Sequence, residues 1–255
     1  EAEVQSRPAE AATPYSFTAV LHSAKGQRGR LVISKEEEAR SYQAELKDAG
    51  YVVGEVKKRE VRQRPTAPFT TSTMQQEAGR KLGRRFTAQR TMAVAQQLYE
   101  GLPLGDGKSE GLITYMRTDS TNLSADALSR CRQHIHDQFG EKYLPASANV
   151  YASKAGAQEA HEAIRPTDVR QRGSNLSLEA DQQRLYDLVR NYFVACQMTH
   201  AQYLSSTLTV TCGDFELRAR GRILVFDGHT RALPSAGKQE NIELPDIPKG
   251  RRLAL

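Results

Sequence analysis

The chain has 255 residues, of which 38% are hydrophobic and 26% are charged. This composition indicates one large or two modest folded domains and excludes an intrinsically disordered chain. No apolar run approaches the roughly 20 residues that a membrane-spanning helix requires, and the polar opening segment has no hydrophobic core of a signal peptide. The formal net charge of +6 favours a polyanionic partner such as nucleic acid.

The cysteines give a further limit on the class of protein. Cys131, Cys196 and Cys212 are scattered, and no CxxC pair occurs. Neither a zinc ribbon nor a disulfide framework is therefore expected. A reducing cytoplasm is the expected location.

The first segment of the chain is predicted to be rich in strands. Residues 14–21 alternate apolar and polar side chains, which is typical of a half-buried strand. After a turn, residues 30–34 are predicted to form its partner strand. The sequence SKEE, which begins at Ser34, is a capping box and predicts a short helix, with Gly50 as its C-terminal cap. Residues 51–65 return to strand.

The pattern becomes helical after Pro68. Residues 70–83 and 87–101 both predict helices. Ser72 or Thr73 is the expected N-cap of the first, and Thr87 is the expected N-cap of the second.

A short strand and three helices are predicted next. The strand covers residues 112–117, and a helix over residues 123–140 ends at a glycine. Residues 153–166 are predicted to be helical up to Pro166, because a helix usually stops before proline. Residues 178–199 form a longer amphipathic helix.

Strands resume at Tyr203. The alternation on both sides of Cys212 and Gly213 predicts a hairpin, and residues 222–228 are predicted as a further strand. The order of strands, helices and strands indicates an α+β chain in which one domain is inserted into another. The predicted boundaries are a β-rich domain in two parts, residues 1–65 and 202–255, around a helical domain of residues 66–201.

The stretch GLITYMRTDS, residues 111–120, holds the first candidate site. A tyrosine hydroxyl titrates near pH 10 and needs a neighbouring cation to act as a nucleophile at neutral pH. In an extended segment Arg117 projects on the same face as Tyr115, and its guanidinium suits a pair of phosphate oxygens. Four side chains with hydrogen-bonding groups surround this pair: Thr114, Thr118, Asp119 and Ser120. Judged from this stretch alone, a half-buried strand tyrosine beside a solvated arginine is the better interpretation.

The second candidate cluster is QEAHEAIRP, residues 158–166. On a helix, His161 and Arg165 share one face, as do Gln158 and Glu162, and Glu159 lies close by. A histidine and an arginine on one face could hold a phosphate. A surface helix with ion pairs along it is an equally good interpretation, and metal binding is disfavoured because no second histidine has the required spacing.

The third candidate is a basic run that could follow a nucleic-acid backbone. Its residues are Arg80, Lys81, Arg84, Arg85 and Arg90. The alternative is a solvated helix face. Phe86 is the one aromatic residue in the run, so a base-stacking platform is poorly supported.

These stretches resemble one protein family in the family's own order. GLITYMRTDSTNLS and YASKAGAQEAHEAIRPTD resemble the tyrosine region of the type IA topoisomerases, the family of bacterial DNA topoisomerase I. TAPFTTSTMQQEAGRKLG and MAVAQQLYEG resemble the segment before that tyrosine, and GDFELRARGRILVFDG resembles the strand region after it. The resemblance covers most of the chain.

The resemblance implies that Tyr115 attacks a phosphodiester of single-stranded DNA and forms a 5′-phosphotyrosyl link. Religation would then relax negatively supercoiled DNA without ATP. By the same match Arg117 would hold the scissile phosphate and His161 would hydrogen-bond to it. Asp119, Arg165 and the threonines would line the strand path, together with the other polar and basic residues named above.

The family's further parts are expected outside this chain. The resemblance implies a toroidal enzyme whose N-terminal Toprim domain, absent here, holds Mg²⁺ and a helper lysine, so no metal site is expected within the chain. The chain would be the central fragment of a nucleoid-associated enzyme: a helical tyrosine-bearing domain inserted into a discontinuous arch domain. Alone it is not expected to cleave DNA efficiently. The sequence carries no signal for a membrane or for an oligomeric state.

Three other interpretations are weighed against this one. A non-catalytic single-stranded DNA-binding or interaction module could keep the same fold. The corresponding region of topoisomerase III or of reverse gyrase is a second alternative within the family. A tyrosine recombinase is disfavoured, because its several basic catalytic residues and its late tyrosine are not matched.

Overall fold

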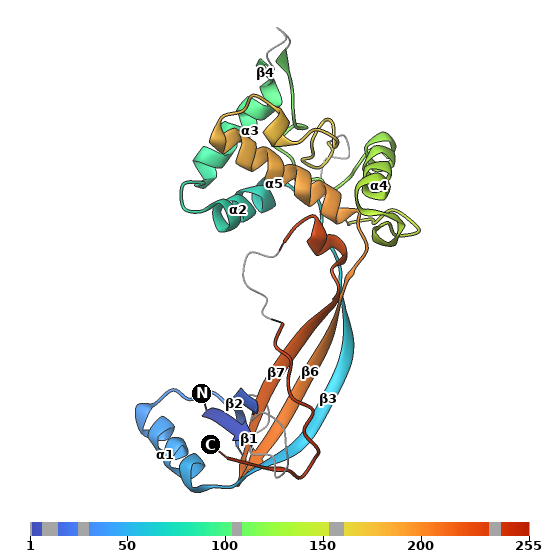
Figure 1. The fold of residues 1–255 in the computed structure, drawn as a ribbon. Helices are drawn as coiled ribbons and strands as arrows, with labels where there is room; N and C mark the ends of the chain where they lie inside the picture. The colour runs from blue at the N-terminus through green and yellow to red at the C-terminus, as the bar shows by residue number, and fades with distance from the viewer. Residues whose placement is uncertain are drawn as a thin grey trace. The chain divides into compact units, whose positions relative to one another are not determined.

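The computed structural model shows an α+β chain made of two compact units (Figure 1). The residues that the structure describes are 2–6, 15–24, 31–103, 109–152, 161–234 and 241–254. The sheet unit consists of residues 1–62, 202–225 and 239–255, and the helical unit consists of residues 63–201 and 226–238. No helix in the described ranges is long and apolar enough to cross a bilayer.

The sheet unit is built on six strands in the order β1-β2-β7-β6-β3-β8. Their bounds are Ala2–Ser6 (β1), Tyr15–Ala24 (β2), Tyr51–Gln63 (β3), Ala201–Cys212 (β6), Phe215–Phe226 (β7) and Arg252–Leu253 (β8). The pairs β1–β2, β2–β7 and β3–β8 are antiparallel. The predicted hairpin joins β6 to β7 through Gly213, whose φ of 57° lies in the left-handed region that glycine tolerates. Figure 1 shows β3, β6 and β7 as long, curved neighbours.

The alternation predicted for the first strand is confirmed, but its partner is not the predicted one. Phe17 and Ala19 of β2 are buried in the core of the sheet unit. Residues 31–34 are not a strand, although the amide of Leu31 donates to the His22 carbonyl at 2.7 Å. Instead, β1 and β7 pair with β2. The residues of β2 that pair with β7 are Val20, Leu21, Ser23 and Ala24, so β7 takes the place at the end of β2 that the sequence assigned to residues 30–34.

Two further predictions for the sheet unit are wrong. Helix α1, Glu36–Asp48, has Lys35 and Ala49 as its caps, not Ser34 and Gly50, and no side chain caps its N-terminus. No residue of α1 is buried. The predicted separate strand of residues 222–228 is the end of β7, which continues without a break to Phe226.

The helical unit is organised around helix α5. Its helices are α2 (Thr71–Leu82), α3 (Ala88–Glu100), α4 (Ala125–Phe139) and α5 (Ala180–Cys196), with 3₁₀ turns at Glu141–Tyr143, Gly173–Asn175 and Gly228–Arg231 and two short paired strands, β4 (Leu102–Pro103) and β5 (Ser109–Glu110). The buried stripe predicted for α5 is confirmed. Leu185 and Val189 pack in one core with α2 and α3, while Phe193 and Cys196 pack in a second core with α4. Figure 1 shows α5 running between these two groups of helices.

Side-chain caps fix where the helices begin. Thr87 caps α3 by accepting the amide of Arg90, as predicted, and Ser124 caps α4. The N-cap of α2 is Thr70, two or three residues before the predicted cap, Ser72 or Thr73. The Thr73 hydroxyl accepts the Thr70 amide at 2.9 Å, which completes a capping box.

The last segment of the helical unit comes from the C-terminal side of the sheet. Residues 226–238, which the sequence places in the final β-rich part, group with the helical unit. The amide of His229 donates to the Thr199 carbonyl at 2.9 Å, and the Phe226 ring lies 5.0 Å from that of Tyr143. These contacts tie the segment to the end of α5.

Candidate active site

Two extended segments, residues 111–120 and 161–167, form the candidate site in the helical unit. Ile113 and Pro166 form an isolated antiparallel bridge, and the Thr114 amide donates to the Arg165 carbonyl at 2.9 Å. The Thr114 hydroxyl donates to the Ala163 carbonyl at 2.8 Å. The two segments are therefore held together by their backbones as well as by side chains.

Neither segment has the regular structure predicted for it. Residues 112–117 contain one bridge residue, Ile113, and no continuous strand. Residues 161–166 are extended, not helical. Their backbone groups bond to distant partners: the Ile164 amide donates to the Phe69 carbonyl at 2.8 Å, and the Thr167 amide donates to the Leu112 carbonyl at 3.0 Å. A helix would use these groups internally, so the long-range pairing replaces it.

Thr71, the first residue of α2, anchors the segment that carries Tyr115. Its hydroxyl donates to the Met116 carbonyl at 2.8 Å and accepts the Thr118 amide at 2.9 Å. Its own amide donates to the Thr118 carbonyl at 2.9 Å. One threonine at a helix start therefore fixes the backbone on both sides of Arg117.

The anchored segment alternates exposed and buried side chains. Tyr115, Arg117 and Asp119 are exposed. Met116 packs in the core of the helical unit, and Thr118 is buried with its hydroxyl accepting the Ser120 amide at 3.0 Å. Ser120 is also fully buried, and its hydroxyl accepts the Asn122 amide at 3.1 Å. The tyrosine, the arginine and the aspartate thus share the solvent-facing side of the loop.

The Tyr115 ring lies between two other aromatic rings and remains 39% exposed. The His161 ring is 5.6 Å away at an interplanar angle of 64°, and the Tyr99 ring is 5.4 Å away at 65°. Arg117 has no carboxylate within ion-pair distance among the described residues. The Tyr115 phenol thus contacts the His161 imidazole, and the exposed Arg117 guanidinium follows two residues later in the same loop.

Glu162 and Arg165 support this surface from beneath. The Glu162 carboxylate accepts the Ser124 amide at 2.5 Å and the Arg165 guanidinium at 2.6 Å. Burial raises the pKa of Glu162, but the hydrogen bonds from Ser124 and Arg165 outweigh it and hold that pKa below its usual value. The Arg165 side chain is only 14% exposed and also donates to the Pro166 carbonyl at 3.1 Å. Gln158 and Glu159, predicted as neighbours of this cluster, lie outside the described residues.

Comparison with known proteins identifies the family. The model of the DNA topoisomerase family matches residues 9–255. The chain belongs to the DNA topoisomerase family. The chain is 51% identical over 247 residues to DNA topoisomerase 1 of Pseudomonas aeruginosa and 54% identical over 194 residues to that of Escherichia coli. These alignments cover 92% and 76% of the chain but 27% and 21% of the two relatives.

A solved topoisomerase structure has the same fold. The structure of full-length topoisomerase I from Thermotoga maritima superposes with a TM-score of 0.73 at 31% identity. The match covers 93% of this chain and 37% of that one. The chain therefore spans roughly a quarter of the length of its curated relatives and about a third of the matched structure.

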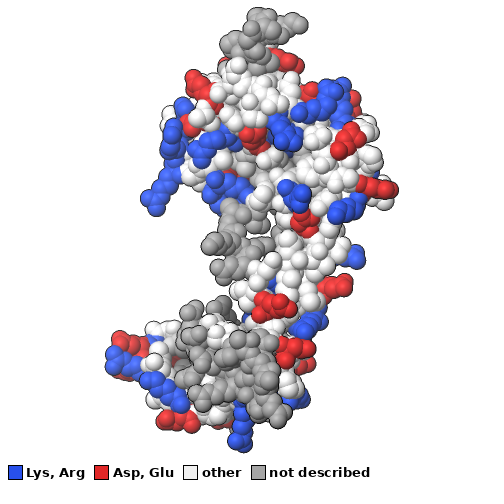
Figure 2. Space-filling model, in the orientation of Figure 1, with Lys and Arg blue, Asp and Glu red and all other residues white. Residues whose placement is uncertain are grey.

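The basic run predicted to contact DNA lies at the end of α2 and the start of α3, and much of it is paired. Arg80 forms a bidentate ion pair with Glu77 in α2. Arg85 and Arg90 both reach Asp181, at 3.4 and 2.8 Å. Arg84 is exposed. Figure 2 shows Lys and Arg side chains spread over the visible face of the helical unit, with acidic side chains between them.

Asp181, the acidic partner of Arg85 and Arg90, is a buried residue. Its side chain is buried at the start of α5, between α3 and the loop that precedes it. The hydrogen bond from Arg90 outweighs the effect of burial and lowers the pKa of Asp181. The ion pairs therefore join α3 to α5, and three of the five residues of the basic run, Arg80, Arg85 and Arg90, form ion pairs within the fold.

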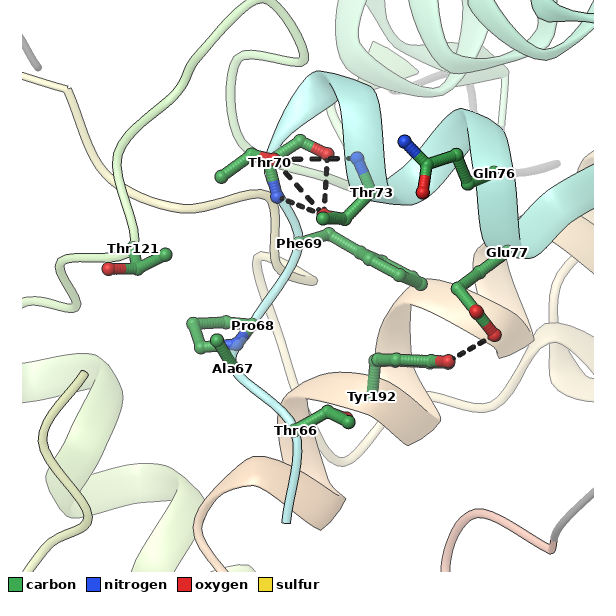
Figure 3. Close-up of a pocket in the computed structure, with 10 residues that line it drawn as sticks. All are labelled: Thr66, Ala67, Pro68, Phe69, Thr70, Thr73, Gln76, Glu77, Thr121 and Tyr192. Carbon is green, nitrogen blue, oxygen red and sulfur yellow. Dashed lines mark hydrogen bonds between the residues drawn. The ribbon is translucent and has the colours of Figure 1, made fainter. Parts of the chain in front are cut away.

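A pocket of about 190 Å³ opens beside the N-terminus of α2 (Figure 3). Its floor includes Phe69, whose ring stacks on that of Tyr192 at 4.0 Å. The Tyr192 hydroxyl donates to Glu77, and Thr121, from the end of the Tyr115 loop, reaches the opposite wall (Figure 3). The pocket therefore adjoins the candidate active site without containing Tyr115.

The fold brings two residues to the site that sequence reasoning did not assign to it. Tyr99 is near the end of α3, in a stretch with an ordinary helical pattern. Thr71 is the first residue of α2, and no local pattern links it to residues 45 and 47 positions further on. Only the chain's long-range packing reveals either contact.

The described part of the chain offers no site that fits Mg²⁺. It holds no group of three or more His, Cys, Asp or Glu side chains that could bind a metal ion. Asp119, the acidic group on the exposed side of the Tyr115 loop, stands apart from such a group.

Proposed function

We propose that this chain is the tyrosine-bearing part of a type IA DNA topoisomerase, and that Tyr115 is the residue that joins DNA covalently. The observation that carries the proposal is the exposed Tyr115 with His161 beside it and Arg117 on the same side of the loop. This arrangement occurs in a chain that belongs to the DNA topoisomerase family. A tyrosine that served packing alone would not need to be held open by an anchored loop.

In the proposed step, the Tyr115 oxygen attacks a phosphorus atom of one DNA strand. The bond between that phosphorus and the 3′-oxygen breaks, so the 5′ end is linked to the tyrosine and the departing strand carries a 3′-hydroxyl. The tyrosine proton is lost and a proton is gained by the leaving oxygen. The reverse step reseals the strand. Because the phosphodiester energy is kept in the phosphotyrosine, relaxation of negatively supercoiled DNA needs no ATP.

Arg117 and His161 are proposed to act on the phosphate. The Arg117 guanidinium would donate two hydrogen bonds to the non-bridging oxygens as charge develops on them. His161 would donate a hydrogen bond to the same group from the other side of the Tyr115 ring. Thr118 and Ser120 are buried, so we assign them to the shape of the loop and not to contact with DNA.

The remaining contacts would position the strand. The substrate is a single-stranded segment of DNA, which is held through its phosphates by exposed Arg84, by the outer faces of Arg80 and Arg85, and by polar groups of the loop. The Toprim domain of the same enzyme would bind Mg²⁺ and complete the site, as the resemblance implies. The helical unit would be an insertion in the discontinuous arch domain, and the enzyme would act at the bacterial nucleoid.

Cleavage by full-length protein variants tests the roles of Arg117 and His161. Arg117→Ala and His161→Ala are each expected to slow cleavage of a single-stranded oligonucleotide about 100-fold or more, as is typical for loss of one transition-state donor. Arg130→Ala removes another exposed arginine, from α4, and is the control. Loss of cleavage that only parallels a loss of thermal stability would contradict the assignment.

A further inference from the structure

We propose that Tyr99 forms a base-stacking site beside Tyr115. Its ligand would be the unstacked nucleobase next to the phosphate that is cleaved. This inference rests on the proposed function and adds to it a residue that neither the motifs nor the basic run indicates. The Tyr115 ring contacts both the Tyr99 ring, with centroids 5.4 Å apart, and the His161 ring, with centroids 5.6 Å apart.

The Tyr99 side chain is exposed to solvent, although the residue before it in α3 is buried in the core. The side chain is 40% exposed, although the neighbouring Leu98 is completely buried in the core of the helical unit. The Tyr99 hydroxyl has no hydrogen-bond partner among the described residues. Its ring therefore contributes one edge contact to Tyr115 and presents much of its surface to solvent.

The backbone holds this ring in a fixed place relative to the Tyr115 loop. The Leu112 amide donates to the Leu98 carbonyl at 2.7 Å. Gly111 passes so close to α3 that a Cβ on it would lie 2.6 Å from the Tyr99 carbonyl oxygen. The end of α3 and the start of the loop thus touch at backbone level, and these contacts fix the spacing of the backbone positions that carry the two tyrosines.

The angle between the rings suits a base on Tyr99 and a phosphate on Tyr115. The two ring planes are inclined at 65°. A base that stacks flat on Tyr99 therefore does not lie flat on Tyr115, and it leaves the phenol oxygen free to meet the backbone. Aromatic side chains stack on any base, so this site would hold a single strand in place with little sequence preference.

A purely structural role for Tyr99 makes a different prediction. If the ring only covers the loop, any large apolar side chain should replace it. If the ring stacks on a base, phenylalanine should replace it but leucine and alanine should not. Tyr42 provides a matched control in the sheet unit, because its ring also makes one edge contact, 5.4 Å from Phe215 at 71°.

The test is a binding scan with single-stranded oligonucleotides that each lack one base. It uses the full-length protein with Tyr115→Phe, so that DNA is bound and not cut. With Tyr99 present, one abasic position next to the cleavage site is expected to weaken binding about 5- to 150-fold, the range typical of one stacked base. That loss should disappear in Tyr99→Ala and Tyr99→Leu, and should remain in Tyr99→Phe and Tyr42→Ala.

The proposal is overturned if no abasic position near the cleavage site weakens binding, or if the loss persists in Tyr99→Ala. Thermal unfolding of each variant shows whether a change follows from loss of folding, and Tyr99→Phe keeps the test informative if Tyr99→Ala is unstable. The proposed function has a separate readout, which is covalent linkage of DNA to Tyr115 in the unsubstituted protein. The two readouts are independent: the stacking proposal can be refuted while covalent linkage to Tyr115 is observed, and covalent linkage can be absent while the stacking result is obtained.

Discussion

The loop that carries Tyr115 should depend on the hydroxyl of Thr71. Replacing Thr71 by valine keeps the size and branching of the side chain and removes that hydroxyl. The buried Thr118 amide then loses its acceptor at 2.9 Å, and the Met116 carbonyl loses its donor at 2.8 Å. An unsatisfied buried amide costs about 1–3 kcal/mol. The backbone bond from the Thr71 amide to the Thr118 carbonyl remains, so we expect a total loss of about 2 kcal/mol.

Two measurements check this expectation. A loss of about 2 kcal/mol should lower the melting temperature of the helical unit by about 4–8 °C. Hydrogen exchange should become faster at residues 116–120, because their backbone is released first. Thr91→Val is the control: Thr91 is fully buried, whereas Thr71 is half-buried, and the Thr91 hydroxyl only donates to the Thr87 carbonyl, which also accepts the Thr91 amide. Unchanged melting and exchange in Thr71→Val would refute the anchoring role.

Two more predictions concern the elements around the site. Glu162→Gln should destabilise the helical unit at neutral pH, because the hydrogen bonds to a charged carboxylate from Ser124 and Arg165 weaken. Since folding lowers the Glu162 pKa, its contribution is full above the ordinary value of about 4.3 and is lost as the pH falls through the folded-state value. The stability gap between the two proteins should therefore narrow in acid, and a gap that widens would refute the reasoning. Gly111→Ala should cost about 1–3 kcal/mol, because its Cβ would lie 2.6 Å from the Tyr99 carbonyl oxygen. Gly50→Ala, where the Cβ meets nothing within 4 Å, is the control, and equal melting temperatures for the two variants would contradict the close approach.

The helices of the helical unit could be predicted from sequence because their signals are local. Thr87 and Ser124 lie directly before apolar repeats, and glycine ends α3 and α4. The stripe of α5 repeats every three to four residues and is buried in the structure, as Leu185 and Cys196 show. Apolar repeats and capping residues can be recognised without knowing which distant residues a segment contacts, so these helices were predicted correctly.

The segments whose structure was predicted wrongly are those whose backbone groups pair with residues far away in the sequence. Residues 161–166 have a helical spacing of polar side chains, but the amide of Ile164 bonds to Phe69, about a hundred positions earlier in the chain. In the same way β2 pairs with β7 and not with residues 31–34. Local patterns carry no information about such partners.

The candidate site also combines residues that local sequence patterns indicate with residues that only long-range contacts bring together. Tyr115 and Arg117 were identified from their stretch and from the family resemblance. The proximity of His161 to Tyr115 was expected from that resemblance and not from a helical face, since the histidine lies on an extended segment. Tyr99 lies in the stretch MAVAQQLYEG, which resembles the family, but its place near the end of a regular helix does not indicate a contact with Tyr115.

Identification of the residue that is covalently linked to DNA tests the central claim most directly. The full-length protein would be incubated with Mg²⁺ and a single-stranded oligonucleotide, denatured rapidly, digested with protease and nuclease, and examined by mass spectrometry. We predict one modified peptide, with a 5′-phosphonucleotide on Tyr115, and no adduct in Tyr115→Phe. An adduct on another residue, or one that persists in Tyr115→Phe, would contradict the account.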